Sequence, residues 1–375
     1  MAQQEQYIRA AVVHEKGAAF RIENVRLGAI REDEILVRIV ACGVCHTDIL
    51  VRDQIAPVPL PAIAGHEGAG VVETVGSAVT EVRPGDHVVM SYIYCGHCKP
   101  CLSGHPAYCQ QVWPINFGGG RLDGTTSARD KEGCVLHDHF FGQSSFAEYS
   151  VTNERNVVKV PNDLSLEILA PLGCGIQTGA GGVLNALQVR PGSSFAAFGA
   201  GAVGLAAIMA ARVAGATTII AVDVNADRLV LAKDLGASHV VNSSEGDPVE
   251  QIHAIVDGGL DYSLECSGHS EVLRQAIDAL GIFGTCGIIG ATKLGTVMPF
   301  DVNNVMALGK RIMGVIQGDA VAKTFIPDLI DLYRQGRFPF DRLIKTYDFA
   351  EINQAIEDSE KGRTIKPVLR IGATS

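Results

Sequence analysis

The sequence predicts an α/β protein of two domains, one rich in strands and one built as a doubly wound parallel sheet. Three observations carry this prediction: a length of 375 residues, a change of hydrophobic pattern near residue 175, and a glycine-rich turn between two apolar segments. Single hydrophobic cores stop growing at roughly 250 to 300 residues, so a chain of this length is expected to divide. We expect the strand-rich domain at 1–175 and 316–375, and the parallel-sheet domain at 176–315.

Short alternating apolar runs, punctuated by glycine and proline, fill the first 160 or so residues. The runs at 35–40 and 88–94 are examples, and this pattern predicts strands. The last part of the chain has amphipathic patterns at 325–333 and 352–360, which predict helices in a mixed region. We therefore expect the last part to fold back onto the first domain.

The pattern changes from about Gly175, where apolar runs begin to alternate with helical patterns. The predicted strands lie at 195–198, 219–222 and 286–289, and the predicted helices lie at 175–187, 202–213 and 271–280. Strands that alternate with helices are typical of a parallel sheet covered by helices.

The composition argues against several classes of protein. With 31 basic and 41 acidic residues the net charge is −10, which disfavours binding to nucleic acid or to an anionic membrane surface. The uncharged stretch 193–211 has nearly the length of a membrane-spanning helix, but its glycines divide it into strand, turn and helix. Glu5 and Arg9 interrupt the place where a signal peptide has its apolar core, so we expect a cytoplasmic protein.

The chain has ten cysteines, which in a reducing compartment indicate metal binding or catalysis rather than disulfides. Cys95, Cys98, Cys101 and Cys109 follow the spacing C-x2-C-x2-C-x7-C. Four thiolates this close in sequence can surround one tetrahedral zinc and leave no position open for chemistry, which predicts a structural site. An iron–sulfur cluster and free thiols are the alternatives, and the spacing differs from the common ferredoxin patterns.

The motif G-x-G-x-x-G at Gly199, Gly201 and Gly204 follows a predicted strand and opens a predicted helix. Alone, such a motif also fits a tight turn in a glycine-rich chain, but Asp223 ends the next predicted strand, 19 residues past Gly204. This context is the fingerprint of a Rossmann dinucleotide-binding domain, whose glycines bring the pyrophosphate to a helix N-terminus. Asp223 is expected to accept hydrogen bonds from ribose hydroxyls, which predicts NAD rather than NADP. Arg228 is expected either to reach the ribose or to be solvated.

A second group of potential metal ligands is spread along the chain. It consists of Cys45 in GVCHTD, His66 and Glu67 in GHEGAG, and Cys174 in LGCG. Singly, a cysteine is usually a buried apolar residue and a histidine is usually only hydrogen-bonded. Together with a dinucleotide fold, two cysteines and a histidine suggest a zinc with a fourth position open for water or alcohol, which is the ligand set of alcohol dehydrogenases.

These motifs, with VRPGDHVV, the four-cysteine loop, GCGIQTGAG, FGAGAVGL and VDVN, extend over essentially the whole chain. Through them the sequence resembles the zinc-containing medium-chain alcohol dehydrogenases, and within that family most of all the bacterial aryl-alcohol (benzyl alcohol) dehydrogenases. The resemblance implies a GroES-like catalytic domain beside the Rossmann domain, NAD as cofactor, two zinc ions per chain and a homodimer or homotetramer.

The resemblance also implies roles for individual residues. Cys45, His66 and Cys174 would hold the catalytic zinc, and Thr47 would hydrogen-bond the substrate hydroxyl. Asp48 would fix the tautomer of His66, and Glu67 would lie behind the metal. The implied cofactor contacts are His46 and Lys366 at the pyrophosphate, Thr178 and Val203 beside the nicotinamide, and Ile289.

One position departs from the family pattern. Many members relay the alcohol proton to a histidine five positions after the first zinc cysteine, and this chain has Leu50 there. Thr47 and the ribose can still begin the relay, while water, His46 or another group must complete it.

The implied activity is the reversible oxidation of primary aromatic or allylic alcohols to aldehydes with NAD. Candidates for the substrate-pocket wall are Trp113, Ile115, Tyr92, Phe140 and Ile289, for each of which a core role is equally expected. The alternative substrates are geraniol and other terpene alcohols, or S-(hydroxymethyl)glutathione. The latter usually needs a basic anchor, and residues 110–120 contain no Arg or Lys.

Two other classes of function are less consistent with the sequence. A zinc module that binds nucleic acid is disfavoured by the net charge of −10 and by Lys99 as the only Lys or Arg of the four-cysteine loop. A zinc-free quinone or enoyl reductase of the same superfamily would lack the metal ligands, and this chain retains all of them.

Overall fold

The computed structural model describes residues 6–372, which form two compact units. The first unit contains the residues up to Cys174, Val321–Pro327 and the residues from Asp341 onward. The second unit contains Gly175–Ala320 and Asp328–Phe340. Relative to the expected division, the second unit therefore extends past residue 315 and also includes part of the expected C-terminal region.

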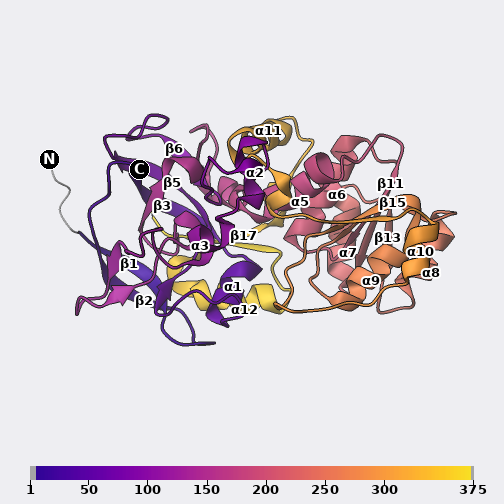
Figure 1. The fold of residues 1–375 in the computed structure, drawn as a ribbon, viewed down its shortest axis with the longest axis horizontal. Helices are drawn as coiled ribbons and strands as arrows, with labels where there is room; N and C mark the ends of the chain where they lie inside the picture. Colours follow the sequence, from indigo (N-terminus) through magenta and orange to yellow (C-terminus); the bar gives the residue numbers. More distant parts are fainter. Residues whose placement is uncertain (1–5, 373–375) are drawn as a thin grey trace. The chain divides into compact units, whose positions relative to one another are not determined.

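The second unit is built on a parallel sheet (Figure 1). Its strands, in spatial order, are β13 (His239–Asn242), β12 (Thr218–Asp223), β11 (Ser194–Phe198), β14 (Leu260–Glu265), β15 (Leu280–Ile288) and β16 (Arg311–Gly314). Every neighbouring pair is parallel. This is the doubly wound order 3-2-1-4-5-6 of dinucleotide-binding folds, so the predicted α/β fold class is confirmed.

Helix α5 (Gly175–Gly181) precedes the first of these strands in the chain, and five helices connect them: α6 (Ala202–Ala214), α7 (Ala226–Leu235), α8 (Pro248–Ile255), α9 (Ser270–Asp278) and α10 (Val302–Ala307). All five residues of β11 are buried, as expected for a strand covered on both faces. Helix α6 ends where Gly215 takes the left-handed conformation at φ 85°, a conformation that costs glycine little. The chain then turns directly into β12.

The first unit contains two mainly antiparallel sheets. The larger has the order β10 (Val157–Lys159), β6 (His87–Met90), β5 (Glu67–Val75), β3 (Glu34–Gly43), β18 (Lys366–Arg370) and β17 (Ile344–Asp348), with β9 (Tyr149–Asn153) also paired to β3. The smaller has the order β4 (Ala62–Ile63), β1 (Gln6–Val13), β2 (Arg21–Leu27), β7 (Ala128–Arg129) and β8 (Val135–Leu136). The yellow strand β18 lies beside the indigo strand β3, so the last part of the chain does return to the first (Figure 1).

Short helices complete the chain. The remaining α-helices are α1 (His46–Arg52), α2 (Lys99–Leu102), α3 (Val112–Phe117), α4 (Leu166–Leu169), α11 (Ala322–Arg334) and α12 (Ile352–Glu360). The other short helical turns are η1 (Pro106–Tyr108), η2 (Phe140–Gly142), η3 (Glu154–Asn156), η4 (Ala170–Gly173), η5 (Gly182–Ala186), η6 (Gln317–Asp319), η7 (Phe340–Leu343) and η8 (Phe349–Glu351). Among residues 6–372, no helix combines the length and the apolar character that crossing a bilayer requires.

The strand expected at 88–94 is shorter than predicted, because β6 ends at Met90. Beyond it, the Ser91 hydroxyl donates to the carbonyl of Gly173 at 2.7 Å, and the Ser91 N–H donates to the carbonyl of Asn156 at 2.9 Å. These bonds lead the chain away from the sheet, toward the four-cysteine loop.

A cluster of buried charges fastens the loop before η2 to the start of β3. Arg121 donates to both carboxylate oxygens of Glu34, at 2.5 and 2.9 Å. Nδ1 of His139 lies 2.6 Å from Asp138, and Nε2 of His139 lies 3.7 Å from Glu34. Two acidic and two basic side chains thus neutralise one another away from water, which is the arrangement that buried charges require.

This cluster shifts two pKa values in opposite directions. Burial alone would lower the pKa of His139, but the Asp138 carboxylate raises it to about 9. Burial alone would raise the pKa of Glu34, but hydrogen bonds from His139 and Arg121 lower it to about 2. The stabilisation from His139 is therefore complete below about pH 6.5 and is lost as the pH rises through 9. The stabilisation from Glu34 is complete above about pH 4.5 and is lost as the pH falls toward 2.

We expect the free energy of unfolding of the first unit to fall between pH 6.5 and 9.5, by up to about 3 kcal/mol, and His139→Gln to flatten this slope. Urea unfolding at a series of pH values measures this free energy, with the fluorescence of Trp113, the single tryptophan of the chain, as the signal. His253→Gln, on the exposed surface of α8, is the control and should keep the slope. An unchanged slope in His139→Gln would contradict the assignment.

Candidate active site

Three segments that carry potential metal ligands meet inside the first unit. Cys45 is the N-cap of α1, His66 directly precedes β5, and Cys174 directly follows η4. One donor atom of each, together with a carboxylate oxygen of Glu67, lies within 4.8 Å of the others. The structure thus brings together the residues that the resemblance assigned to a catalytic zinc.

The imidazole of His66 is fully buried and is oriented by Asp48. Its Nδ1 lies 2.8 Å from the Asp48 carboxylate, which also accepts the backbone N–H groups of Gly65 at 3.0 Å and Cys45 at 2.9 Å. The other ring nitrogen, Nε2, is buried and has no hydrogen-bond partner within residues 6–372. A buried nitrogen without a partner is costly. A metal ion at Nε2 removes that cost, so the residues fit a metal.

The two cysteines of this group share a hydrogen bond. The bond from Cys174 lowers the pKa of the Cys45 thiol well below its usual value, although burial acts against it. The same bond, together with burial, raises the pKa of Cys174. At His66 burial opposes the charge of Asp48, and the net effect raises the pKa of the imidazole. A thiolate is therefore already favoured at Cys45, and thiolates are the form in which cysteines bind metals.

Lys366, which was expected at the cofactor pyrophosphate, is instead bonded to Glu67 inside the first unit. Its ammonium is 2% exposed and donates to both carboxylate oxygens of Glu67, at 2.9 and 3.0 Å, and to the carbonyl of Val44 at 3.2 Å. The pairing of β18 with β3, and of β3 with β5, places Lys366 and Glu67 together. All three ammonium donors are used, so none is free for a phosphate.

Glu67 also needs space that only glycine provides. Burial raises the pKa of its carboxyl group, while the charge of Lys366 lowers it, and the net shift is upward. A Cβ atom at Gly43 would lie 2.0 Å from a Glu67 carboxylate oxygen. The buried pair is thus built into the sheet, beside the metal ligands.

The first turn of α1 carries the other residues expected near the substrate. Thr47 is half-buried, and its Oγ1 lies 3.8 Å from the sulfur of Cys45. His46 is exposed, whereas Leu50 is buried with 8% exposure. The apolar side chain of Leu50 cannot accept a proton, so a relay through that position is absent.

Aromatic rings pack beside His66. The ring of Phe141 lies 4.6 Å from the imidazole of His66, and that of Phe140 lies 5.4 Å from it. Phe117 contacts both of these rings, and Trp113 contacts Phe117 at 4.9 Å. Trp113 and Phe140 are among the wall residues expected from the sequence, whereas Phe117 and Phe141 are not. The pair Phe140-Phe141 in the sequence was the available signal.

Two of the proposed wall residues lie elsewhere in the first unit. Ile115 packs with Cys95 and Cys109, on the four-cysteine loop. Tyr92 is 2% exposed, and its ring lies 6.0 Å from that of Tyr94. Both therefore have the core role that the sequence left open.

The glycine turn after β11 has the shape that a dinucleotide needs. Gly199 has φ 99°, and a Cβ at Gly204 would lie 1.8 Å from the Gly199 carbonyl oxygen. A Cβ at Gly201, the N-cap of α6, would meet nothing within 4 Å. The first and third glycines thus permit the tight turn, while the second leaves open space at the N-terminus of α6, where a pyrophosphate binds in such folds.

Asp223, at the end of β12, lies beside this turn. Its carboxylate accepts the N–H groups of Ala200 at 2.6 Å and Asn225 at 2.9 Å. Nη1 of Arg228 lies 3.9 Å from it, and Nε of Arg228 is buried without a hydrogen-bond partner within the described part of the chain. Asp223 and Arg228 therefore lie together beside the glycine turn, as expected from the sequence.

The residues expected beside the nicotinamide lie on α5 and α6, and Ile289 follows β15. A Cβ at Gly179 of α5 would lie 2.0 Å from the carbonyl oxygen of Val203, so the two helices are in close contact. Oγ1 of Thr178 lies 3.5 Å from the side chain of Gln317, a contact that the sequence did not suggest. Ile289 packs against Gly182, where a Cβ would lie 2.9 Å from it.

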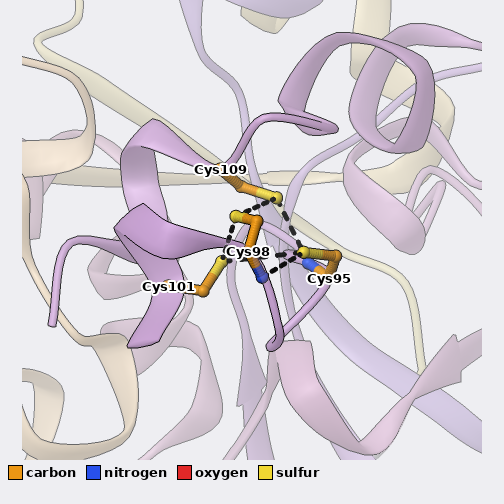
Figure 2. A group of neighbouring side chains, drawn as sticks. All are labelled: Cys95, Cys98, Cys101 and Cys109. Atoms are coloured by element: carbon orange, nitrogen blue, oxygen red, sulfur yellow. Dashed lines mark hydrogen bonds between the residues drawn. The ribbon is translucent and has the colours of Figure 1, made fainter. Parts of the chain in front are cut away.

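The four cysteines of the loop at 95–109 form the other potential metal site of the first unit (Figure 2). Their sulfur atoms are separated by 3.4 Å (Cys98–Cys101) and 3.9 Å (Cys95–Cys101 and Cys98–Cys109). Sulfurs that surround one zinc at about 2.3 Å lie about 3.8 Å apart. Backbone N–H groups point at these sulfurs, and they lower the pKa of the Cys98 thiol to about 6. The loop therefore fits one zinc.

Comparison with known proteins identifies the family. Residues 31–162 match the model described as alcohol dehydrogenase GroES-like domain, and residues 202–335 match that described as zinc-binding dehydrogenase. The geraniol dehydrogenase of Castellaniella defragrans is 46% identical over 96% of this chain and 97% of its own length. The benzyl alcohol dehydrogenase structure from Acinetobacter calcoaceticus is 52% identical with a TM-score of 0.95, over 98% of this chain and 100% of that one. The structure of an alcohol dehydrogenase zinc-binding domain protein from Burkholderia ambifaria is 57% identical with a TM-score of 0.97, over 99% of this chain and 100% of that one. The chain belongs to the zinc-containing medium-chain alcohol dehydrogenase family.

Proposed function

We propose that this alcohol dehydrogenase oxidises primary aromatic or allylic alcohols to aldehydes with NAD, and reduces the aldehydes in the reverse direction. The observation that carries the proposal is the buried Nε2 of His66, which has no hydrogen-bond partner within residues 6–372, in a histidine grouped with Cys45 and Cys174 and packed beside aromatic rings. The names of two relatives support it. Geraniol and benzyl alcohol both carry a primary hydroxyl on a carbon next to an unsaturated carbon, and aromatic side chains bind such groups well.

The proposed mechanism assigns a task to each residue around the metal position. When bound, zinc supplies a Lewis acid for the substrate hydroxyl and NAD supplies the hydride acceptor. Cys45, His66 and Cys174 would hold the zinc, Asp48 orients His66 through Nδ1, and Lys366 fixes Glu67 behind the ligands. Oγ1 of Thr47 would accept a hydrogen bond from the substrate hydroxyl. Because Leu50 cannot take the proton onward, we assign the next step to water at His46, which is exposed in the same turn.

We propose NAD as the cofactor and a cofactor site on the second unit. Gly199, Gly201 and Gly204 would hold the pyrophosphate, and Asp223 and Arg228 would bind the adenosine ribose. Thr178 and Val203 would contact the nicotinamide, and Ile289 would also contact the cofactor. The carboxylate of Asp223 would repel a 2′-phosphate, which supports NAD over NADP.

The alternative substrate S-(hydroxymethyl)glutathione has less support from the arrangement of arginines. An anionic substrate needs a free basic side chain near the pocket. Arg121 is instead committed to the buried pair with Glu34, and Arg129 lies on β7, where it donates to the carbonyl of Gly133 at 3.3 Å. Geraniol and other terpene alcohols remain the second candidate, because a relative carries that name.

We also propose a homodimer or homotetramer and a cytoplasmic location. Strand β16 is the last strand of its sheet, and large apolar side chains are exposed near it, among them Phe283 at 73% and Met306 at 71%. An edge strand beside exposed apolar residues favours pairing with a second copy. None of the ten cysteines, all of which lie within residues 6–372, forms a disulfide, which fits a reducing compartment.

A panel of benzyl alcohol, geraniol, ethanol and S-(hydroxymethyl)glutathione tests the substrate class. We expect kcat/KM with NAD to be highest for the first two. Phe117→Ala removes one apolar ring and should lower kcat/KM for benzyl alcohol and geraniol by about tenfold, with little change for ethanol. Tyr7→Ala, at an exposed position of β1, is the matched control. A large preference for ethanol, or for the glutathione adduct, would defeat the aryl and allylic assignment.

Metal analysis tests the two sites separately. We expect two zinc ions per chain, one for each group of potential ligands. Cys45→Ala should retain one zinc, because the four-cysteine loop is intact. Its kcat/KM should fall on the order of a thousandfold, because the Lewis acid is removed. Mass spectrometry of the native protein measures the number of zinc ions per chain, and steady-state kinetics measure the activity. A wild-type protein without zinc would instead support a zinc-free reductase.

Cofactor preference tests the role of Asp223. Asp223→Asn keeps the shape of the side chain but removes its charge. We expect the ratio of kcat/KM for NAD to that for NADP to fall by about 10- to 100-fold, because hydrogen bonds to a charged acceptor contribute about 1.5 to 3 kcal/mol. Asp227→Asn, exposed on α7, is the control. Equal use of both cofactors by the wild type would contradict the proposal.

A further inference from the structure

Gln143, which directly follows η2, is a buried polar side chain with no role in the mechanism above. It is 1% exposed, and all four hydrogen-bonding positions of its amide are used. Nε2 donates to the carbonyl oxygens of His66 and Ser91, both at 3.0 Å. Oε1 accepts the backbone N–H of Gly68 at 3.0 Å and the hydroxyl of Ser145 at 2.7 Å. Two carbonyls face the nitrogen and two donors face the oxygen, so the orientation of the amide is fixed.

These bonds connect two of the segments that carry metal ligands. The bonds to His66 and Gly68 hold the backbone on both sides of Glu67. The bond to the Ser91 carbonyl continues through the Ser91 hydroxyl, which donates to the carbonyl of Gly173 at 2.7 Å. Gly173 directly precedes Cys174. A continuous path therefore runs from the backbone of His66 to that of Cys174 through two buried side chains.

Asp48 makes the complementary connection. Its carboxylate contacts the imidazole of His66 and accepts the backbone N–H of Cys45, so it joins the first ligand segment to the second. Gln143 and Ser91 join the second segment to the third. Asp48 acts on the side chain of His66, whereas Gln143 acts on its backbone.

The backbone of Gln143 is itself held in place. The hydroxyl of Ser150, on β9, donates to the carbonyl oxygen of Gln143. The N–H of the neighbouring Ser145 donates to the carbonyl of Gly65 at 2.7 Å. A Cβ at Gly68 would lie 2.2 Å from the Ser145 hydroxyl, so the two chains touch only because Gly68 has no side chain.

We propose that Gln143, acting with Ser91, is a positioning residue of the catalytic metal centre, which sets the spacing between His66 and Cys174. This inference rests on the proposed assignment of Cys45, His66 and Cys174 as zinc ligands. Groups that orient metal ligands influence metal affinity about 10- to 100-fold when they are removed. An apolar residue of the same size would leave buried carbonyl and N–H groups without partners, and the ligand backbones would move to satisfy them.

The test compares metal release from the two sites of the holoenzyme. In Gln143→Met the new side chain has about the length of glutamine but cannot replace the hydrogen bonds of its amide. We expect a chelator to remove the catalytic metal 10- to 100-fold faster than from the wild type, while release from the four-cysteine loop is unchanged. Loading the catalytic site with cobalt(II) should also show shifted visible absorption bands, because these report the geometry of the ligands. Neither readout requires turnover.

A milder variant covers the case in which Gln143→Met fails to fold. Ser91→Ala removes the hydroxyl that donates to the Gly173 carbonyl but keeps the Gln143 amide, and we expect a smaller acceleration of metal release in the same direction. Ser263→Ala is the matched control. Ser263 is also fully buried and donates to a backbone carbonyl, that of Ala276 at 2.8 Å, but it lies on β14 of the second unit. Its metal release should equal that of the wild type.

The outcomes separate this inference from the proposed function. If the wild type holds no metal at Cys45, His66 and Cys174, both fail. If it holds that metal, but Gln143→Met and Ser91→Ala release it at the wild-type rate with unshifted cobalt bands, the function stands and the positioning role is overturned. If the variants release metal equally faster from both sites, or if Ser263→Ala accelerates release as they do, the role is general packing and the inference is also overturned.

Discussion

The proposed catalytic metal centre depends on one constraint: the backbone groups of three separate segments must find hydrogen-bond partners at a buried point of the first unit. Cys45, His66 and Cys174 each lie beside an element end, where N–H and C=O groups have no regular partner. Buried side chains supply the missing partners. Asp48 receives two backbone N–H groups, while the Gln143 amide joins two carbonyls to one N–H. The sheets of the first unit bring the loops near one another, and these polar side chains fix the final spacing.

Much of the fold and part of the site could be predicted because their signals are local. The glycine turn at Gly199, the acidic residue at the end of the next strand and the four closely spaced cysteines each need only a short stretch of sequence to be recognised. The alternation of strands and helices gave the parallel sheet for a similar reason. The ligand group of Cys45, His66 and Cys174 is not local: the residue types together with a dinucleotide fold suggested a zinc site, and the family resemblance implied the role of each residue.

The rest depends on register and packing between distant segments. Lys366 occupies the position of a family residue that contacts the cofactor, yet the register of β18 on β3 turns its ammonium to Glu67. Gln143 resembles any polar loop residue in the sequence, because the three backbone groups that its amide bonds lie 52 to 77 positions away. Phe141 was missed because the sequence shows two adjacent phenylalanines but does not show that both rings pack against the imidazole of His66. A single sequence without an alignment does not show which residues of distant segments contact one another.

The pairing of Lys366 with Glu67 also has a consequence for the order in which the protein matures during synthesis. The two residues are 299 positions apart, and domains that are translated first generally fold first. Glu67 and all the residues of the parallel sheet, which ends with β16 at Gly314, leave the ribosome before Lys366 does. The second unit can therefore complete its sheet while the carboxylate of Glu67 still lacks its counter-ion and remains hydrated. The first unit can therefore close around its potential metal ligands only after β18 has been synthesised.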